Sequence, residues 1–283
     1  MQPYFRIFIA SFFALSAAQI AAQDSPEPRK NDYSIVTDRP SISYSSGTVP
    51  RGIFQFESGF QYSRNNLRNN LGNNNTYGEL YNMPNIVFRT GITDRWELHL
   101  GWDLLKNKFV FNNQTLVNEI NSNALTVGSR VAIFDKADGW RPEMTFFGAV
   151  QLPFTTSQPD GAINTLFRFC MQHSATENLS VFYNLGADFS EVSNGTPNSS
   201  FLQATGAYTL GANYAFNSHF NLYGEIYGYL PYRNFQHTFG FDGGVVYLIN
   251  KQIQLDAVGG FTINNSNFTP FFTLGFSAFL KTK

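Results

Sequence analysis

Charged side chains are scarce in this sequence, and cysteine is almost absent. Lysine and arginine number 19 and aspartate and glutamate 20, so 14% of the 283 residues are charged, against about 25% in ordinary soluble domains. The net charge of −1 excludes the strongly basic surface that nucleic-acid binding requires. A single cysteine, Cys170, excludes an intramolecular disulfide, a zinc site built from thiolates and a CxxC redox pair.

Long hydrophobic runs are also missing beyond the first 22 residues. A membrane-spanning helix needs about 20 consecutive apolar residues, and the mean hydropathy is only −0.20, so the sequence predicts no such helix. Residues 1–22 combine Arg6, an apolar stretch and then Ala21 and Ala22, which is typical of a cleaved secretory signal peptide. We therefore expect an exported protein, and one without a lipid anchor, because no cysteine follows the cleavage region.

Aromatic residues are abundant, at 17% of the chain, and they follow a period of two. From Phe54 to Tyr62, apolar side chains occupy nearly every second position, and the stretch from Trp96 to Leu104 repeats the pattern with aromatic residues near both ends. This is the period of a β-strand with one apolar face, whereas a helix has a period of 3.6.

Twelve such strands are predicted, most of them about 10 to 13 residues long, against the roughly 9 to 11 residues that cross a bilayer. They span 52–63, 80–92, 96–105, 123–134, 143–152, 164–175, 179–189, 201–216, 220–230, 237–248, 252–262 and 270–280.

The connections alternate between very short turns, at 93–95, 176–178, 217–219 and 249–251, and longer polar loops, among them 64–78, 106–122 and 191–200. Short turns at one rim and long loops at the other are typical of outer-membrane barrels. We therefore predict an all-β fold, a transmembrane antiparallel β-barrel over residues 52–283 with both termini on the periplasmic side. The alternative, a soluble sandwich or lipocalin-like barrel, would need more surface lysine and glutamate than this chain has.

The turn lengths also predict which residues face one another across each hairpin. A three-residue turn at 93–95 pairs Arg89 with His99, and the turn at 176–178 sets Arg168 diagonal to Asp188. The turn at 249–251 predicts Gly244 opposite Asp256. In each case side chains of similar polarity share a face, as strand pairing requires.

In a membrane barrel the apolar face meets lipid and the polar face lines the lumen. The alternation places Ile86, Phe88, Leu98, Leu100 and Val181 outside. The predicted lumen-lining residues are Glu57, Arg89, Glu97, His99, Asp103, Arg130, Arg168, Asp188, Glu225, Asp242 and Asp256.

The predicted lumen contains seven carboxylates and three arginines, which favours weak cation selectivity. We expect Glu57, Asp242 and Asp256 to contribute most, because their strands carry no lumenal arginine. The alternative is that the lumenal charges pair in a structural network.

Residues 23–51 lie between the predicted signal peptide and the barrel. Asp24 to Asp32 is polar and typical of a loose linker, whereas Tyr33 to Tyr44 is typical of an ordered segment. Two interpretations remain open: an unstructured periplasmic tail, or a partial plug in which Asp38, Arg39 and Pro40 enter the barrel mouth and the two charges pair with lumenal groups.

Part of the chain resembles a known family. Thr37-Asp38-Arg39-Pro40, Thr48-Val49-Pro50-Arg51-Gly52, the strand Gln55 to Tyr62 and the strand-turn-strand Phe88 to Leu98 are similar to the bacterial outer-membrane family called transporter or MetA-pathway of phenol degradation. The matched motifs cover about a quarter of the chain. The resemblance implies a barrel that takes up small solutes, aromatic compounds among them, and it implies no phenol-degrading enzyme.

Catalytic motifs are not found in the sequence. It contains no GxSxG elbow, no HExxH and no glycine-rich phosphate loop, and only four histidines, of which His173 is the one candidate base for an outer-membrane hydrolase. We expect no catalytic residue, no metal and no cofactor.

The predicted function is a passive outer-membrane, porin-like channel for small solutes. The alternatives are a structural or adhesive barrel with a plugged lumen and, more remotely, a hydrolase. The expected partners are outer-membrane lipid, a small-molecule solute and the periplasmic insertion machinery during biogenesis, with no nucleic acid.

Overall fold

The computed structural model describes residues 33–66, 76–135, 139–153, 163–193, 200–233, 236–264 and 267–282. The predicted signal peptide, the linker from Asp24 to Asp32 and the middle of the Asn-rich loop at 64–78 lie outside these residues. Within them the strands are β1 (Ile53–Asn66), β2 (Tyr77–Gly91), β3 (Trp96–Phe111), β4 (Gln114–Ser122), β5 (Leu125–Phe134), β6 (Glu143–Leu152), β7 (Asn164–Ser174), β8 (Leu179–Ser193), β9 (Ser200–Ala215), β10 (Phe220–Pro231), β11 (Thr238–Asn250), β12 (Ile253–Asn264) and β13 (Asn267–Lys281).

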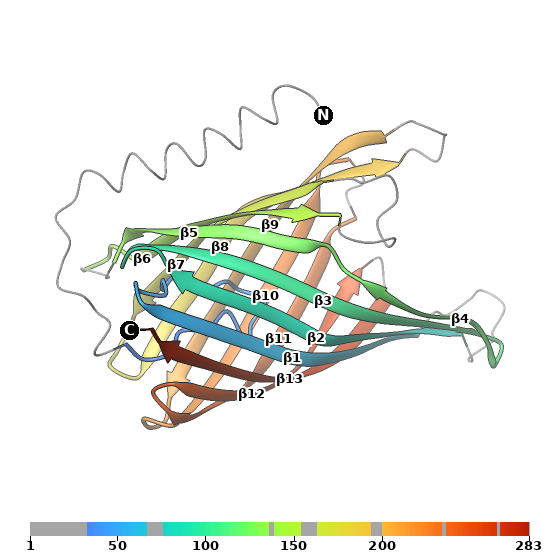
Figure 1. The fold of residues 1–283 in the computed structure, drawn as a ribbon. Helices are drawn as coiled ribbons and strands as arrows, with labels where there is room; N and C mark the ends of the chain where they lie inside the picture. Colours follow the sequence, from blue (N-terminus) through green and yellow to red (C-terminus); the bar gives the residue numbers. More distant parts are fainter. Residues whose placement is uncertain are drawn as a thin grey trace.

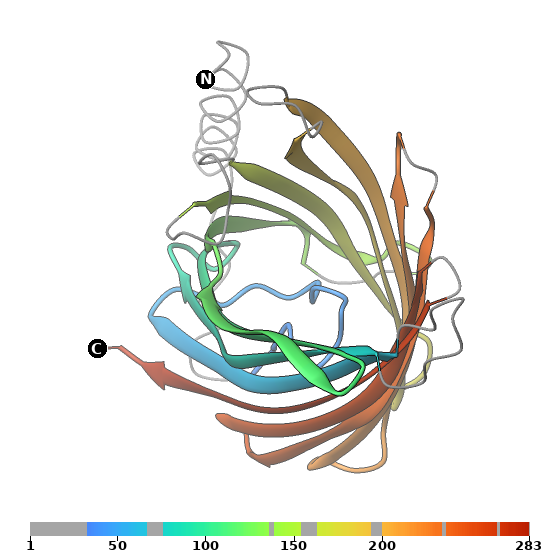
Figure 2. The ribbon, with the colours of Figure 1, turned by 90° about the vertical axis from the view of Figure 1, so that its right-hand side faces the viewer.

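Twelve of the described strands close into an antiparallel barrel (Figures 1 and 2). β1 pairs with β13, where Phe54 faces Leu280 and Tyr62 faces Phe272, so the last strand meets the first. The wall continues from β1 through β2 and β3 to β5, and then in chain order to β13. The predicted all-β, twelve-stranded barrel is confirmed.

The predicted loop at 106–122 is wrong, because this stretch forms a hairpin that continues β3 and adds β4 (Figure 1). Its turn is Asn112-Asn113, with φ of 48° and 66°. Asparagine tolerates this left-handed region, which two-residue hairpin turns require. The asparagines therefore mark a turn within a hairpin rather than an irregular loop.

β4 and β5 occupy the same place beside β3. β3 pairs through residues 104–111 with β4 and through 96–101 with β5. β4 and β5 therefore act as one long strand that is interrupted at Asn123-Ala124. The number of strands in the barrel wall stays at twelve.

Two of the three residue pairings that were predicted from the turn lengths are confirmed, and the third is wrong. Arg89 faces His99, and Arg168 faces Gly186, which places it diagonal to Asp188. Asp256, however, faces Val246 rather than Gly244. The reason is that β11 continues to Asn250, whose Oδ1 accepts the amide of Gln252 at 2.7 Å and so tightens the turn. The shift is two residues, so every side chain keeps its predicted face.

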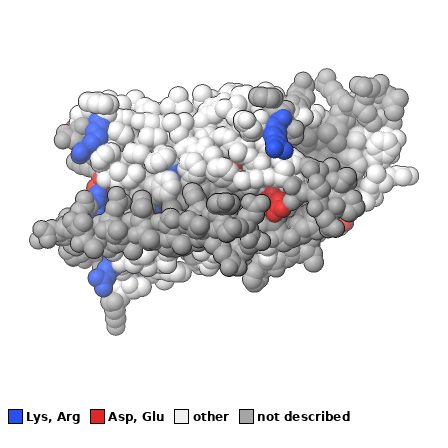
Figure 3. Space-filling view, turned by 90° about the horizontal axis from the view of Figure 1, so that it is seen from above, with Lys and Arg blue, Asp and Glu red and all other residues white. Residues whose placement is uncertain are grey.

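The outer face of the wall is apolar and the inner face is polar, which is the reverse of a soluble barrel. Leu98, Leu100 and Leu274 are exposed on the outer face, whereas Glu57 and Arg130 are fully buried on the inner face. The charged side chains visible from above lie mostly toward the two ends (Figure 3). The described residues contain no helix long and apolar enough to cross a membrane. An apolar outer belt on a closed barrel is what hydrocarbon requires of a strand-built membrane protein, so the molecule is an integral outer-membrane barrel.

Candidate functional site

Residues 33–51, hereafter the inner segment, run inside the barrel (Figure 2). At one end, the Ile35 amide donates to the Lys251 carbonyl oxygen in the β11–β12 turn at 2.9 Å. At the other, the Arg51 amide donates to Asp94 Oδ1 in the β2–β3 turn at 3.2 Å. Both turns are short, so the inner segment enters and leaves at the rim of the barrel that carries the short turns.

Glutamates of the barrel wall accept hydrogen bonds from the backbone of the inner segment. Glu57 Oε2 accepts the amides of Asp38 at 3.1 Å and Arg39 at 3.3 Å, and Glu97 Oε2 accepts the Val49 amide at 2.5 Å. Glu225 accepts the amides of Ile42 and Ser43 and the hydroxyl of Ser43. Three of the predicted lumenal carboxylates thus satisfy amides that would otherwise lack partners within the barrel.

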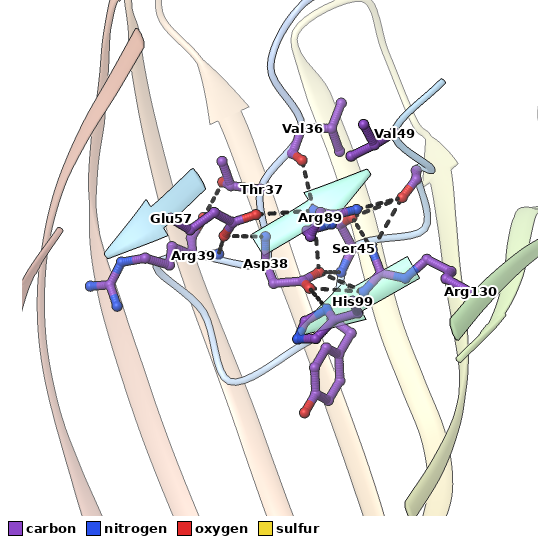
Figure 4. Close-up of polar contacts among 12 residues, drawn as sticks. Val36, Thr37, Asp38, Arg39, Ser45, Val49, Glu57, Arg89, His99 and Arg130 are labelled. Atoms are coloured by element: carbon purple, nitrogen blue, oxygen red, sulfur yellow. Dashed lines mark hydrogen bonds and ion pairs between the residues drawn. The ribbon is translucent and has the colours of Figure 1, made fainter. Parts of the chain in front are cut away.

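Arg89 and Arg130 connect Glu57 and Glu97 to Asp38, and Figure 4 shows Asp38 and Glu57 with the two arginines. Arg89 donates to both Glu97 oxygens, at 2.9 and 3.0 Å, and to Glu57 Oε1 at 3.2 Å. Arg130 Nη2 donates to both Asp38 oxygens, at 2.8 and 2.9 Å. His99 Nδ1 lies 3.8 Å from Asp38 Oδ2. The predicted set of lumenal charges therefore includes a buried network centred on the inner segment.

Asp38 remains ionised in this environment. Burial alone would raise the pKa of its carboxyl, but the guanidinium groups of Arg130 and Arg89 hold that pKa well below its usual range. The carboxylate also accepts the Ser45 amide at 2.9 Å, which fixes the turn of the inner segment between residues 38 and 45.

Arg39 lies in a notch formed by two glycines. Gly59 and Gly275 face each other across β1 and β13, and a Cβ at either position would collide with the Arg39 side chain. The guanidinium donates to Asp256 Oδ1 at 3.1 Å and Thr273 Oγ1 at 2.8 Å. The strands of Glu57 and Asp256 carry no lumenal arginine, as predicted, but both carboxylates are nevertheless paired, because Arg89 approaches Glu57 from a neighbouring strand and Arg39 approaches Asp256 from the inner segment. The expected cation selectivity loses this support.

The remaining predicted residues lie farther from the network. Arg168 pairs with Asp188 at 2.7 Å, and Asp103 accepts from Asn85 at 2.5 Å. Asp242 is buried, faces Glu225 across β10 and β11, and has two carboxylate oxygens without a hydrogen-bond partner among the described residues. Pro40, predicted with Asp38 and Arg39, lies in the inner segment and borders the cavity described next.

A cavity of about 480 Å³ lies within the barrel, and Asp38 to Tyr44 of the inner segment form part of its lining. The wall contributes amides, a charged pair and aromatic residues, among them Gln61, Asn82, Asn85, Gln151, Asn164, Arg168, Asp188, Tyr229 and Phe271. A volume of this size fits the usual range for small-molecule sites, about 300–1,000 Å³.

Several residues of the site were not predicted, although they follow the same alternation. Asn184 binds the Tyr44 backbone in both directions, accepting its amide at 2.6 Å and donating to its carbonyl at 3.0 Å. Gln254 Nε2 donates to Thr37 Oγ1 at 3.0 Å. Tyr44 packs on Phe147 with ring centroids 4.6 Å apart. The alternation along β8, β12 and β6 was a usable signal for Asn184, Gln254 and Phe147, because Asn184 and Gln254 share a face with Asp188 and Asp256, and Phe147 is the strand neighbour of Arg130.

The geometry offers little to metal or acyl-transfer chemistry. Within the described ranges, no group of three or more histidine, cysteine, aspartate or glutamate side chains is placed to hold a metal ion. His173 Nε2 lies 3.2 Å from the Tyr183 hydroxyl and stacks on that ring, so the candidate base contacts a tyrosine.

A family model described as "Putative MetA-pathway of phenol degradation" matches residues 37–278. The chain belongs to this family. The match extends well past the motifs at residues 37–98 and confirms the resemblance seen in the sequence. No curated protein matches the chain in sequence.

Solved structures show the same fold. The COG4313 outer membrane channel from Pseudomonas putida F1 gives a TM-score of 0.63 at 11% identity, covering 91% of this chain and 100% of that chain. The translocator domain of the autotransporter NalP from Neisseria meningitidis gives 0.54 at 10% identity, covering 95% and 97%. These neighbours are described as a channel and a translocator domain rather than as enzymes.

Proposed function

We propose that this protein is an outer-membrane channel for passive uptake of small solutes, aromatic compounds among them, with a lumen narrowed by the inner segment. The observation that carries the proposal is the cavity bordered by Asp38 to Tyr44. Its amides, charged pair and aromatic residues suit a small solute that has both a ring and a hydrogen-bonding group. The family description and the Pseudomonas putida channel support the same function. Insertion by the periplasmic machinery belongs to this proposal.

Removing most of the inner segment tests whether it narrows the lumen. Deletion of residues 24–45 is expected to raise single-channel conductance severalfold in a planar bilayer, because it removes the chain that crosses the lumen while leaving β1 to β13 intact. Solute flux, measured by liposome swelling with sugars, amino acids and aromatic acids, should rise in parallel. Unchanged conductance in a folded deletion variant would contradict the proposal. A barrel that conducts in neither form would instead support the structural or adhesive alternative.

The glycine notch gives a finer test that leaves the barrel wall complete. Gly59→Ala places a methyl group where the Arg39 guanidinium lies, so it should change the conductance in the same direction and by a similar amount as Arg39→Gln. Gly101→Ala is the matched control, since a Cβ there meets Thr126 at an ordinary 3.4 Å. If Gly59→Ala and Gly101→Ala give the same conductance as the unmodified protein, Arg39 does not fix the position of the inner segment.

A further inference from the structure

The outer surface of β1, β2 and β3 changes in character toward the end of the barrel that carries the long loops (Figure 1). Phe56, Phe88 and Leu100 face outward side by side in the apolar part. Farther along the same three strands, Tyr62, Tyr81 and Lys106 are neighbours. The surface thus passes from purely apolar to aromatic and basic within a few residues of each strand.

A compact set of side chains makes this transition, and we call it the outer cluster: Tyr62, Arg64, Tyr77, Glu79, Tyr81, Lys106 and Lys108. The Arg64 guanidinium lies 4.0 Å from the centroid of the Tyr77 ring, and the Lys106 and Lys108 ammonium groups lie 5.8 Å from the Tyr81 and Tyr77 rings. Tyr62 and Tyr81 are 5.0 Å apart, centroid to centroid. Cation–π contacts of this kind hold the basic groups close to the wall.

The outer cluster carries an excess of positive charge. Glu79 is its single carboxylate, and it accepts from Lys108 Nζ at 3.1 Å and from the Tyr62 hydroxyl at 3.0 Å. No carboxylate in the part of the chain that the structure describes lies within ion-pair distance of Arg64 or Lys106. Arg64 is the strand neighbour of Glu79 and also interacts with it electrostatically. Three cations thus share one carboxylate, which leaves the outer cluster with a net charge of +2.

The depth of the outer cluster matches the lipid headgroups. Phe88 and Tyr81 lie opposite Phe56 and Tyr62, which are only six residues apart along β1 because the register of β2 is irregular between Asn82 and Asn85. Six residues correspond to about 15 Å along the barrel axis for a strand tilted by about 40°. Half the hydrocarbon thickness is about 15 Å. Ile120, 65% exposed, is the direct strand neighbour of Lys106, and Met83, 57% exposed, lies two residues from Tyr81 along β2.

We propose that the outer cluster binds a phosphorylated lipid of the outer leaflet, with Arg64 and Lys106 contacting its phosphates. Arg64 Nε donates to Asn66 Oδ1 at 3.1 Å, and the terminal N–H groups of the stacked guanidinium suit phosphate oxygens. Met83 and Ile120 contact the acyl chains below. The inference concerns the outer wall alone and does not depend on the function proposed for the lumen.

The test compares lipid A carrying two phosphates with the same lipid after its phosphates are removed. The full-length protein in detergent is titrated with each, and bound lipid is counted by native mass spectrometry. The unmodified protein should retain the phosphorylated form preferentially. Arg64→Gln and Lys106→Gln should each weaken that binding about fivefold, the effect expected for one basic side chain at an anionic lipid surface.

Lys251→Gln with Lys281→Gln is the matched control, because both lysines lie at the periplasmic rim, and this variant should bind the phosphorylated lipid like the unmodified protein. Equal retention of the two lipids would overturn the proposal, as would an equal loss in the control variant. Complete competition by millimolar inorganic phosphate would also overturn it, because it would mean that the outer cluster binds the free anion.

Discussion

Arg89→Met should lower the free energy of unfolding by about 3–5 kcal/mol, the cost of removing one partner from a buried ion pair. Arg89, Glu57 and Glu97 are all fully buried, and the guanidinium bonds to both carboxylates. Without it, two negative charges remain in the wall with too few donors. Reversible urea unfolding in lipid vesicles, followed by tryptophan fluorescence, measures the difference.

The control for Arg89 is the same substitution at Arg168. The Asp188 side chain that pairs with Arg168 is 34% exposed and borders the cavity, where water can solvate it. Arg168 itself is buried, but its removal leaves a carboxylate that water can reach, so Arg168→Met should cost less than Arg89→Met, about 1 kcal/mol. Equal losses for the two variants would mean that the Arg89 network is hydrated and contributes little.

Leu100→Arg should destabilise the folded barrel by about 2–4 kcal/mol, the cost of arginine on the lipid-facing surface near the bilayer midplane. Leu100 is 42% exposed on the outer face, between strand neighbours Phe88 and Val127. In the membrane its side chain meets hydrocarbon. The same unfolding measurement in vesicles gives this value.

Gly101→Arg is the internal comparison, since the next residue along β3 faces the other way. Gly101 borders the cavity, and a Cβ there meets Thr126 and His99 at ordinary contact distances. An arginine at 101 enters a polar space and should change stability little. If both arginines destabilise the barrel equally, the assignment of the two faces loses its basis.

The barrel could be predicted because its wall follows a local rule. The alternation from Trp96 to Leu104 and the turn at 93–95 together define which side chains share a face, and the structure has Arg89 opposite His99 as expected. The predictions were wrong where the same residues are compatible with two local structures. Asn112 and Asn113 suit a loop as well as a tight turn, and the side chain of Asn250 shifts a ladder by two residues.

The contacts of the inner segment follow no local rule. Arg39 meets Asp256, 217 positions away, and Tyr44 meets Asn184, 140 positions away. The alternation along a strand predicts which side chains face the lumen. It does not predict which residue of the inner segment each of them contacts. Pairing Asp38 and Arg39 with lumenal groups could be hypothesised from charge alone, whereas the identity of those groups depends on where the inner segment turns.

Closure of a barrel normally removes every strand edge, yet the β3–β4 hairpin reintroduces one. Among the described strands, β4 pairs on one side only, with β3. Its other side presents a row of backbone amides and carbonyls, the feature through which a further strand can add to a sheet. Of its residues only Glu119 is charged, so little opposes such addition. When the protein is concentrated outside a membrane, β4 is where one copy would extend its sheet onto the next.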